Sequence, residues 1–332
     1  GGGRIGKMHV ENLLFALQQA DVVAVADPFA DAIQDWAREV GIARLTKDAG
    51  EVISDPDIDA IIICSPTDTH ADYIIECAKA GKNILCEKPI SFDVGKTRVA
   101  LEEVKKANVK LQVGFNRRFD SNAMKLRETI ESGGIGQQYI VRVTSRDPAP
   151  PPIEYVKVSG GIFVDMMIHD FDMVRFLTGS EVKEIYAKGA CLIDPEIGKV
   201  GDVDTAIVTL TFENGAIGVI ENSRKAGYGY DQRMEVFGSK GSVESDNRTD
   251  SEVIIRNEGG VTGQKPLWFF IERYKDAYLR EIQSFVEAVL NDENVAVDGE
   301  DGLAAVLIGL AATESLRSGK PIVYKEFVKS LA

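Results

Sequence analysis

The feature that most constrains this chain is a regular exchange of strand-like and helix-like segments over residues 1–116. Short apolar runs such as VVAVAD (22–27), AIIICSP (60–66) and NILCEKP (83–89) have the pattern of strands buried on both faces. Segments of helical period, roughly 10–15 residues long, separate them. Since such connections are right-handed crossovers between parallel strands, the pattern predicts a doubly wound parallel sheet of the Rossmann type.

After residue 118 the alternation of strands and helices ends, and between 181 and 256 strand-like runs follow one another with no room for helices between them. Runs this close predict a large, mostly antiparallel open sheet. The elements expected in this part are a helix over 121–133, a strand over 137–147, a helix over 161–178, strands between 181 and 256, and helices over 273–291 and 300–318. We therefore expect an α/β domain over 1–118 and an α+β domain over 119–332.

Composition narrows the class of protein. Of the 332 residues, 44% are hydrophobic and 27% are charged, as in a soluble globular protein. The apolar runs fall short of the roughly 20 residues that span a bilayer, so no membrane association is expected. A net charge of −14 argues against a nucleic-acid partner, because phosphate backbones require clustered Lys and Arg.

The cysteines and histidines indicate neither disulfides nor a metal site. The four cysteines form no C-x-x-C pair, which favours reduced, buried thiols in a cytoplasmic protein. They are Cys64, Cys77, Cys86 and Cys191. The three histidines, His9, His70 and His169, lie far apart in sequence without the spacing of metal ligands, so no metal is expected.

The chain opens with GGGRIG, in which Gly1, Gly3 and Gly6 match G-x-G-x-x-G, the phosphate-binding turn of dinucleotide sites. Alone, the stretch can equally be a flexible leader. Asp27 decides between the two, because it ends a strand 21 residues after Gly6, close to where an acidic residue meets the adenosine ribose. A carboxylate there favours NAD over NADP, since it repels a 2′-phosphate. Asp27 can also cap the next helix, and both roles can coexist.

If Gly1 begins the turn, Arg4 and Ile5 begin the helix whose free N–H groups meet the pyrophosphate. Such a turn normally follows a strand, and no strand precedes Gly1 here. We therefore expect the natural chain to start several residues earlier, with a short hydrophobic strand that ends at Gly1.

Two further stretches come after predicted strands, where doubly wound sheets bind their ligands. In CSPTDTH (64–70), the backbone of Ser65, Pro66 and Thr67 and the ring of His70 are expected to line the nicotinamide half of the site. His70 is alternatively a capping or packing residue. In CEKP (86–89), Glu87 and Lys88 are expected at the cofactor, with Lys88 projecting into the same crevice unless it is an ordinary surface charge.

The stretch GGIFVDMMIHDFDMVRFLTG (160–179) holds the candidate acid–base pair. On a helix, Asp165 and His169 are i and i+4, so they share a face and can form a hydrogen bond. An Asp that orients a His gives a general base of fixed tautomer. The alternative is a satisfied pair at the edge of a core, and Asp172 can replace Asp165 as the partner of His169.

Taken together, GGGRIG, CEKP and DMMIHDFD resemble the glucose–fructose oxidoreductase, inositol dehydrogenase and rhizopine catabolism (Gfo/Idh/MocA) family over essentially the whole chain. Within it, GFNRRFD (114–120), TSRDPAPPP (144–152) and GYGYDQR (227–233) most resemble the bacterial inositol 2-dehydrogenases. The resemblance implies NAD-dependent oxidation of a ring alcohol, for example myo-inositol to scyllo-inosose. Lys88, Asp165 and His169 would then form the catalytic set.

In that set His169 takes the hydroxyl proton, Asp165 orients it, and Lys88 hydrogen-bonds the reacting oxygen. A polyol also needs several directional hydrogen bonds. The candidates for these are Asn116, Arg117, Asp147 and Tyr230, with Tyr228 as the alternative to Tyr230.

The strands DTAIVTLTF (204–212) and AIGVIENSR (216–224) leave one sheet face with a mixed apolar character, which predicts homo-oligomerisation. The family resemblance implies a tetramer joined through this sheet. Two alternatives remain open: a dehydrogenase of the same family acting on another sugar or sugar derivative, and a dinucleotide-binding sensor without catalysis. The sequence does not tell which hydroxyl is oxidised.

Overall fold

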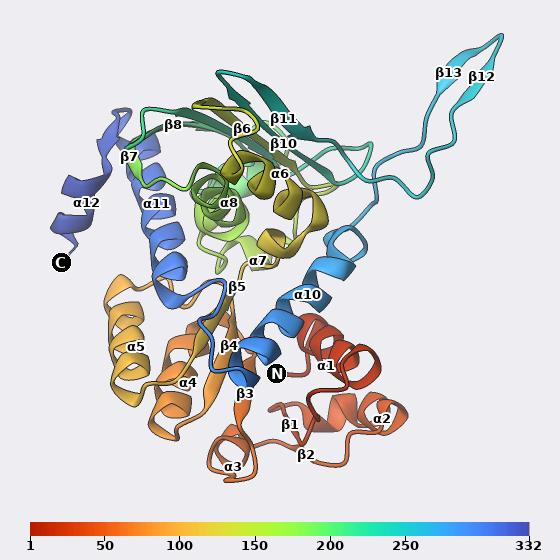
Figure 1. Ribbon diagram of the computed structural model, residues 1–332, viewed down its shortest axis with the longest axis vertical. Coiled ribbons are helices and arrows are strands. Elements are labelled where there is room, and N and C mark those ends of the chain that lie inside the picture. Colours follow the sequence, from red (N-terminus) through yellow and green to blue (C-terminus); the bar gives the residue numbers. More distant parts are fainter. Residues whose placement is uncertain (332) are drawn as a thin grey trace. The chain divides into compact units, whose positions relative to one another are not determined.

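The computed structural model describes residues 1–331 and divides the chain into two compact units (Figure 1). Unit 1 comprises Gly1–Asn116 and Asp276–Ala304, and unit 2 comprises Arg117–Lys275 and Ala305–Ala332. The break after Asn116 lies near the boundary expected after residue 118. The return of the chain to unit 1 was not expected. It follows from burial, because Ile282 packs against Leu13 and Leu17.

The strands of unit 1 are parallel, as the alternation of segments predicts. A three-stranded sheet has the order β3–β4–β5, and β1 pairs with β2. The strands are β1 (Val25–Ala26), β2 (Leu45–Thr46), β3 (Ala60–Ile63), β4 (Asn83–Glu87) and β5 (Leu111–Gly114). The strand expected over 22–27 is thus reduced to two residues.

Helices separate these strands in sequence. They are α1 (Arg4–Ala16), α2 (Ala30–Val40), α3 (Ala49–Ile53), α4 (Thr67–Lys79) and α5 (Val94–Ala107). Helix α5 begins where the side chain of Asp93 accepts a hydrogen bond from the N–H of Lys96. Helix α2 ends at Gly41, whose φ of +85° is the left-handed conformation of a helix C-cap. Helix α10 (Phe270–Leu290) begins in unit 2 and ends in unit 1.

Unit 2 is built on a seven-stranded sheet of order β11–β10–β6–β9–β8–β7–β14 (Figure 1). Its strands are β6 (Gln138–Arg146), β7 (Val182–Ala190), β8 (Thr205–Phe212), β9 (Ile217–Ser223), β10 (Asp231–Gly238), β11 (Gly241–Ser245) and β14 (Ile322–Val323). All neighbours are antiparallel except β6 and β9, which are parallel. The mostly antiparallel sheet is confirmed. The parallel pair arises because a long helical segment, rather than a hairpin, separates β6 from the following strands.

The helical segments of unit 2 are a 3₁₀ turn (Asn116–Phe119, which starts on the last residue of unit 1), α6 (Ser121–Glu131), α7 (Ile153–Val156), a π-helical turn (Ile162–Met166), α8 (Ile168–Thr178), α9 (Pro195–Lys199), α11 (Gly299–Ser318, which starts in unit 1) and α12 (Tyr324–Ser330). The prediction of a single helix over 161–178 is wrong for its first part. Gly160 and Gly161 have φ of +86° and +79°, and the wider turn begins after them.

A hairpin of β12 (Ile255–Asn257) and β13 (Gly260–Thr262) extends away from the seven-stranded sheet (Figure 1). The last of the strands expected between 181 and 256 is therefore β12, which extends one residue beyond that range. Across residues 1–331, none of the helices combines the length and apolar character that crossing a membrane requires.

A buried ion pair anchors α6 in unit 2. The guanidinium of Arg273 donates to both carboxylate oxygens of Asp120, at 2.7 and 3.2 Å. Both side chains are almost fully buried. Asp120 also accepts from the N–H of Asn122, so one carboxylate begins the helix and neutralises the cation.

We predict that Arg273→Met lowers the free energy of unfolding by about 3–5 kcal/mol, because it leaves Asp120 buried without its cation. Urea denaturation followed by fluorescence measures the change. Lys125→Met, which breaks an exposed pair with Glu128, is the matched control and should cost about 0–1 kcal/mol. Equal losses in both variants would contradict this account of the pair.

Candidate active site

The opening glycines form a folded turn rather than a flexible leader. A Cβ at Gly6 would collide with the carbonyl oxygen of Gly1, and a Cβ at Gly1 would lie 2.6 Å from the carbonyl oxygen of Cys64. Gly3 is the N-cap of α1, and a Cβ there would meet open space. The turn therefore packs tightly at Gly1 and Gly6 and borders open space at Gly3, where α1 begins.

Asp27 is bonded to this turn. Its Oδ2 accepts from the N–H of Gly2 at 2.6 Å, and its Oδ1 accepts from the N–H of Phe29 at 2.8 Å. Both roles expected for Asp27 are thus compatible, since it lies beside the glycine turn and also supports the start of α2. Each carboxylate oxygen keeps a second lone pair for a ribose hydroxyl.

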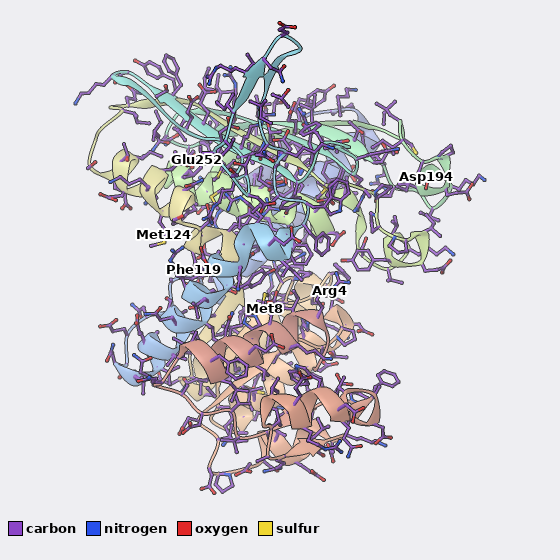
Figure 2. The ribbon with its side chains drawn as sticks, turned by 90° about the vertical axis from the view of Figure 1, so that its right-hand side faces the viewer. Arg4, Met8, Phe119, Met124, Asp194 and Glu252 are labelled. Atoms are coloured by element: carbon purple, nitrogen blue, oxygen red, sulfur yellow. The ribbon has the colours of Figure 1, made fainter. Side chains whose placement is uncertain are left out.

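These groups fit a dinucleotide. The N-terminus of α1 offers backbone donors to a pyrophosphate, the space at Gly3 lets a ligand approach, and Asp27 supplies the acceptor for a ribose. Arg4 and Met8 follow on α1, one turn apart (Figure 2). The individual contacts of Gly1, Gly3, Arg4, Ile5 and Gly6 with a cofactor stay predictions.

The loop after β3 is braced by His70. Its Nδ1 lies 2.8 Å from the carbonyl oxygen of Pro89, and its Nε2 lies 2.8 Å from that of Ser65. The ring therefore connects this loop to the segment after Lys88, which agrees with the packing alternative. Pro66 is the N-cap of α4 and Thr67 its first residue. A contact of these residues with nicotinamide stays a prediction.

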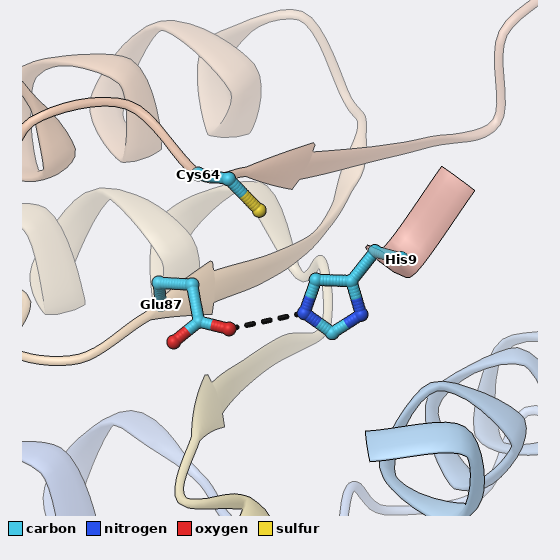
Figure 3. Close-up of side chains that lie close together, drawn as sticks. All are labelled: His9, Cys64 and Glu87. Atoms are coloured by element: carbon cyan, nitrogen blue, oxygen red, sulfur yellow. Dashed lines mark hydrogen bonds and ion pairs between the residues drawn. The ribbon is translucent and has the colours of Figure 1, made fainter. Parts of the chain in front are cut away.

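Glu87, next to Lys88, belongs to a buried cluster that the sequence did not reveal (Figure 3). His9 Nε2 lies 3.0 Å from Glu87 Oε1, and the His9 ring is almost completely buried on the inner face of α1. Gly114 provides the room, since a Cβ there would lie 2.8 Å from Glu87 Oε2. The pair thus connects the helix of the glycine turn to the end of β4.

Cys64 completes a group of three possible metal-ligand atoms that lie within 4.8 Å of one another. Sequence spacing could not show this group, because His9, Cys64 and Glu87 come from three separate segments. Burial, followed by the charge of Glu87, raises the pKa of the Cys64 thiol. Within this group the one hydrogen bond that the structure shows joins His9 to Glu87, and the raised pKa favours the protonated form of the Cys64 thiol.

Glu281, on α10, is the most unusual charged group of unit 1. It is fully buried, and neither carboxylate oxygen has a hydrogen-bond partner among residues 1–331. Its backbone carbonyl accepts from Gln112 Nε2 at 2.9 Å. Burial raises the pKa of Glu281 well above its ordinary value, and the charge of Glu87 adds to the shift. Glu281 is therefore held in its neutral form over a wider pH range than an exposed glutamate.

In unit 2, Asp165 and His169 lie on two different helical segments. Asp165 is in the π-helical turn, and His169 is in the first turn of α8. The two residues therefore do not lie on one regular helix as expected, and the hydrogen bond between them stays a prediction. Both side chains are half-buried. The alternative partner, Asp172, accepts from Arg118 Nε and Nη2 at 2.6–3.1 Å.

Asp165 has two partners that the sequence did not indicate. The hydroxyl of Tyr155 donates to Asp165 Oδ1 at 2.7 Å. Arg224 Nη1 and Nη2 lie 3.4 and 3.5 Å from Asp165 Oδ2. Tyr155 follows the proline-rich stretch and Arg224 follows a strand, and neither position indicates a role in sequence.

Arg117 and Tyr230, both expected at the substrate, take part in an internal network. Arg117 donates to Asp170 at 2.7 Å, to Ser145 at 3.3 Å and to the Tyr230 hydroxyl at 3.2 Å. Asp170 also accepts from Asn222 at 2.7 Å. Burial raises the pKa of Asp170 to about 7 against the opposing pull of Arg117. Direct substrate contacts of Arg117 and Tyr230 stay predictions.

The other expected substrate residues differ in their surroundings. Asn116 is buried at the end of a unit 1 segment. The charge of Asp147 raises the pKa of both Tyr155 and Asp170, so it acts on the surroundings of Asp165 and of Arg117 alike. Tyr228 accepts from Arg146 at 2.9 Å and donates to Asp231. Its hydroxyl is thus engaged on the protein.

Models of known families match both parts of the chain. Residues 1–115 match the oxidoreductase family with an NAD-binding Rossmann fold, and residues 123–244 match the GFO/IDH/MocA C-terminal domain. The chain belongs to the GFO/IDH/MocA oxidoreductase family. Like the family, this GFO/IDH/MocA oxidoreductase is an NAD-dependent dehydrogenase, as its glycine turn and Asp27 indicate.

Individual relatives agree over almost the full length. The chain is 49% identical over 328 residues to the myo-inositol 2-dehydrogenase of Thermotoga maritima. The matched region covers 99% of this chain and 98% of the relative. A crystal structure of a probable dehydrogenase from Thermotoga maritima is 50% identical, with a TM-score of 0.97 and 98% of each chain covered. A scyllo-inositol dehydrogenase from Lactobacillus casei, crystallised with NAD(H) and scyllo-inositol, is 31% identical with a TM-score of 0.91 and covers 98% and 97% of the chains.

We predict that Glu281→Gln makes stability less dependent on pH. The unfolded chain loses the Glu281 proton near pH 4.5, whereas the folded protein keeps it to higher pH. Stability of the wild type therefore falls as pH rises above that value, and the amide removes this fall. Melting temperatures between pH 5 and pH 8 test this, with Tm of the variant gaining on the wild type as pH rises. Glu287→Gln, exposed on the same helix, is the control, and parallel curves for all three proteins would contradict the prediction.

Proposed function

We propose that this dehydrogenase oxidises a cyclic polyol with NAD, most specifically myo-inositol to scyllo-inosose. The observation that carries the proposal is the near-full-length identity of 49% to a myo-inositol 2-dehydrogenase. The likeness to a structure named for scyllo-inositol supports the substrate class. The folded glycine turn with Asp27 supports the choice of cofactor.

In the proposed reaction, NAD supplies the hydride acceptor when bound. The hydroxyl proton must leave as the carbonyl forms, and His169 takes it. Asp165 stabilises the protonated ring of His169. Lys88 follows β4 and donates a hydrogen bond to the reacting oxygen, which favours its alkoxide-like charge.

The remaining hydroxyl groups of the polyol need partners of their own. We propose Asn116, Arg117, Asp147 and Tyr230 for this role. The internal bonds of Arg117 to Asp170 and Tyr230 leave it a rigid cation, and the charge of Asp147 acts on Tyr155, the hydrogen-bond partner of Asp165. Rigid, charged side chains suit a ligand that presents hydroxyl groups in fixed directions.

We also propose a cytoplasmic homotetramer formed through the large sheet. Ile207 on β8 and Ile217 on β9 are about half exposed, at 49% and 52%, on the outer face of that sheet. Exposed apolar side chains on a sheet face favour burial against another copy. Light scattering during size-exclusion chromatography tests this, and a monomer at micromolar concentration would refute it.

The free thiols of the four cysteines support a reducing compartment.

The assay that tests the function measures NADH formation with inositol isomers and aldoses. We expect turnover of myo-inositol, and we expect His169→Ala and Lys88→Ala to lower kcat by about 10²–10⁴-fold, the scale of acid–base catalysis. Lys96→Ala, an exposed lysine on α5, is the control and should keep its activity. Good turnover of an aldose without any turnover of a cyclitol would shift the substrate to another sugar. Binding of NAD without turnover of any substrate would indicate a sensor.

Asp27→Asn tests the cofactor preference while it keeps an acceptor for the N–H of Gly2. The substitution removes the negative charge that opposes a 2′-phosphate. Loss of this repulsion should lower the ratio of kcat/KM for NAD to that for NADP about tenfold or more, which corresponds to about 1.4 kcal/mol. A wild type that already prefers NADP, or a variant with an unchanged ratio, would refute the role of Asp27.

A further inference from the structure

We propose that Tyr155 and Arg224 are positioning residues that hold the carboxylate of Asp165 from two sides, as an oriented anion for proton transfer at His169. The inference rests on the proposed function, in which Asp165 serves His169. It is carried by a continuous set of contacts within unit 2: Tyr155 to Asp165, Asp165 to Arg224, and Arg224 to Asp202.

Arg224 is the cation of this set. It is among the largest fully buried side chains, at 1% exposure, and it directly follows β9. Its backbone N–H donates to the carbonyl oxygen of Asp204 at 2.8 Å, which fixes where the side chain starts. A buried guanidinium requires anions around it, and Asp165 is one of the two it contacts.

Asp202 is the second anion, and it connects Arg224 to the backbone that carries Asp165. Its Oδ2 lies 3.5 Å from Arg224 Nη2, and its Oδ1 accepts from the N–H of Ile162 at 3.0 Å. Ile162 begins the π-helical turn that contains Asp165. A Cβ at Gly161 would lie 2.9 Å from Asp202 Oδ1, so glycine allows this close approach. Arg224 and Asp202 therefore fix the turn as well as the carboxylate.

Tyr155 holds the other oxygen of Asp165. It comes from α7, within the proline-rich loop, and its hydroxyl donates at 2.7 Å. The Tyr155 side chain is 48% exposed, but its hydroxyl lies against Asp165; desolvation raises the pKa of the phenol, and the charges of Asp165 and Asp147 add to this. The phenol therefore stays a neutral donor and does not compete with His169 for the proton.

A carboxylate held by a neutral donor on one oxygen and a cation near the other cannot rotate freely. Its orientation toward a neighbouring imidazole is then set before substrate binds, which lowers the reorganisation that proton transfer requires. Tyr155 and Arg224 both contact the carboxylate oxygens of Asp165. Asp202 lies against Arg224, the charge of Asp147 acts on Tyr155, and His169 follows Asp165 by four residues.

The first test is Tyr155→Phe, which removes only the hydroxyl. We expect kcat for myo-inositol to fall about 10-fold to 100-fold with little change in the KM for NAD. The acid limb of the kcat/KM profile should move to higher pH by about half a unit or more, because an Asp165 without its donor holds the proton of His169 more strongly. Tyr139→Phe, an exposed tyrosine on β6, is the matched control. Unchanged kcat and an unmoved acid limb in Tyr155→Phe would overturn the proposal.

The second test is Arg224→Lys, because Arg224→Met would remove a buried cation and can prevent folding. Arg224→Lys retains the charge and should keep the fold, but it lacks the planar guanidinium. We expect it to lower kcat and to shift the acid limb in the same direction as Tyr155→Phe. A loss of thermal stability with a normal acid limb would assign Arg224 a purely structural role and refute the positioning role.

Asp165→Asn separates this inference from the function on which it rests. If Asp165→Asn retains full turnover, the proposed catalytic role of Asp165 fails. If Asp165→Asn is inactive while Tyr155→Phe and Arg224→Lys behave as the wild type, the catalytic role stands and the positioning role is refuted. Loss of activity in Asp165→Asn with graded losses in the other two variants supports both.

Discussion

The backbone contact between Gly6 and the carbonyl group of Gly1 is the constraint on which unit 1 depends. Only glycine allows that approach, and it brings the start of α1 against the end of β3. The bond from Gly2 to Asp27 then places a carboxylate beside the glycine turn that precedes α1. His9, one turn further along α1, holds Glu87, the residue before Lys88. One turn of backbone thus fixes the cofactor groups and supports the proposed catalytic lysine.

In unit 2 the corresponding constraint is that several acidic residues of one short segment are buried or half-buried and each needs a cation beside it. Three aspartates of the 165–172 segment each contact an arginine. Arg224 serves Asp165, Arg117 serves Asp170, and Arg118 serves Asp172. Buried cations of this kind stabilise little on net, but they fix position and charge, which a proton-transfer site requires. The acid–base chemistry proposed for His169 therefore depends on residues distant in sequence.

Local patterns predicted most of unit 1, because parallel strands and crossover helices follow from periods in the sequence. Asp27 was found for the same reason, as its place at a strand end is a local property. The π-helical turn before α8 was missed because helical spacing alone does not reveal a wider turn. The parallel pairing of β6 with β9 and the return of residues 276–304 to unit 1 depend on packing between distant segments. Arg224 and Glu281 look like surface residues in sequence, and only their burial distinguishes them, whereas Tyr155 is 48% exposed and is distinguished by its hydrogen bond to Asp165.

The central claim is that this chain transfers a hydride from a ring carbon of a cyclic polyol to NAD. The most direct measurement incubates the enzyme with NAD and myo-inositol that carries deuterium on all ring carbons, and examines the reduced cofactor by NMR. The account predicts one deuterium at C4 of the nicotinamide ring, together with a ring ketone as product. Reduced cofactor without deuterium, or no reduction with any cyclitol, would contradict it.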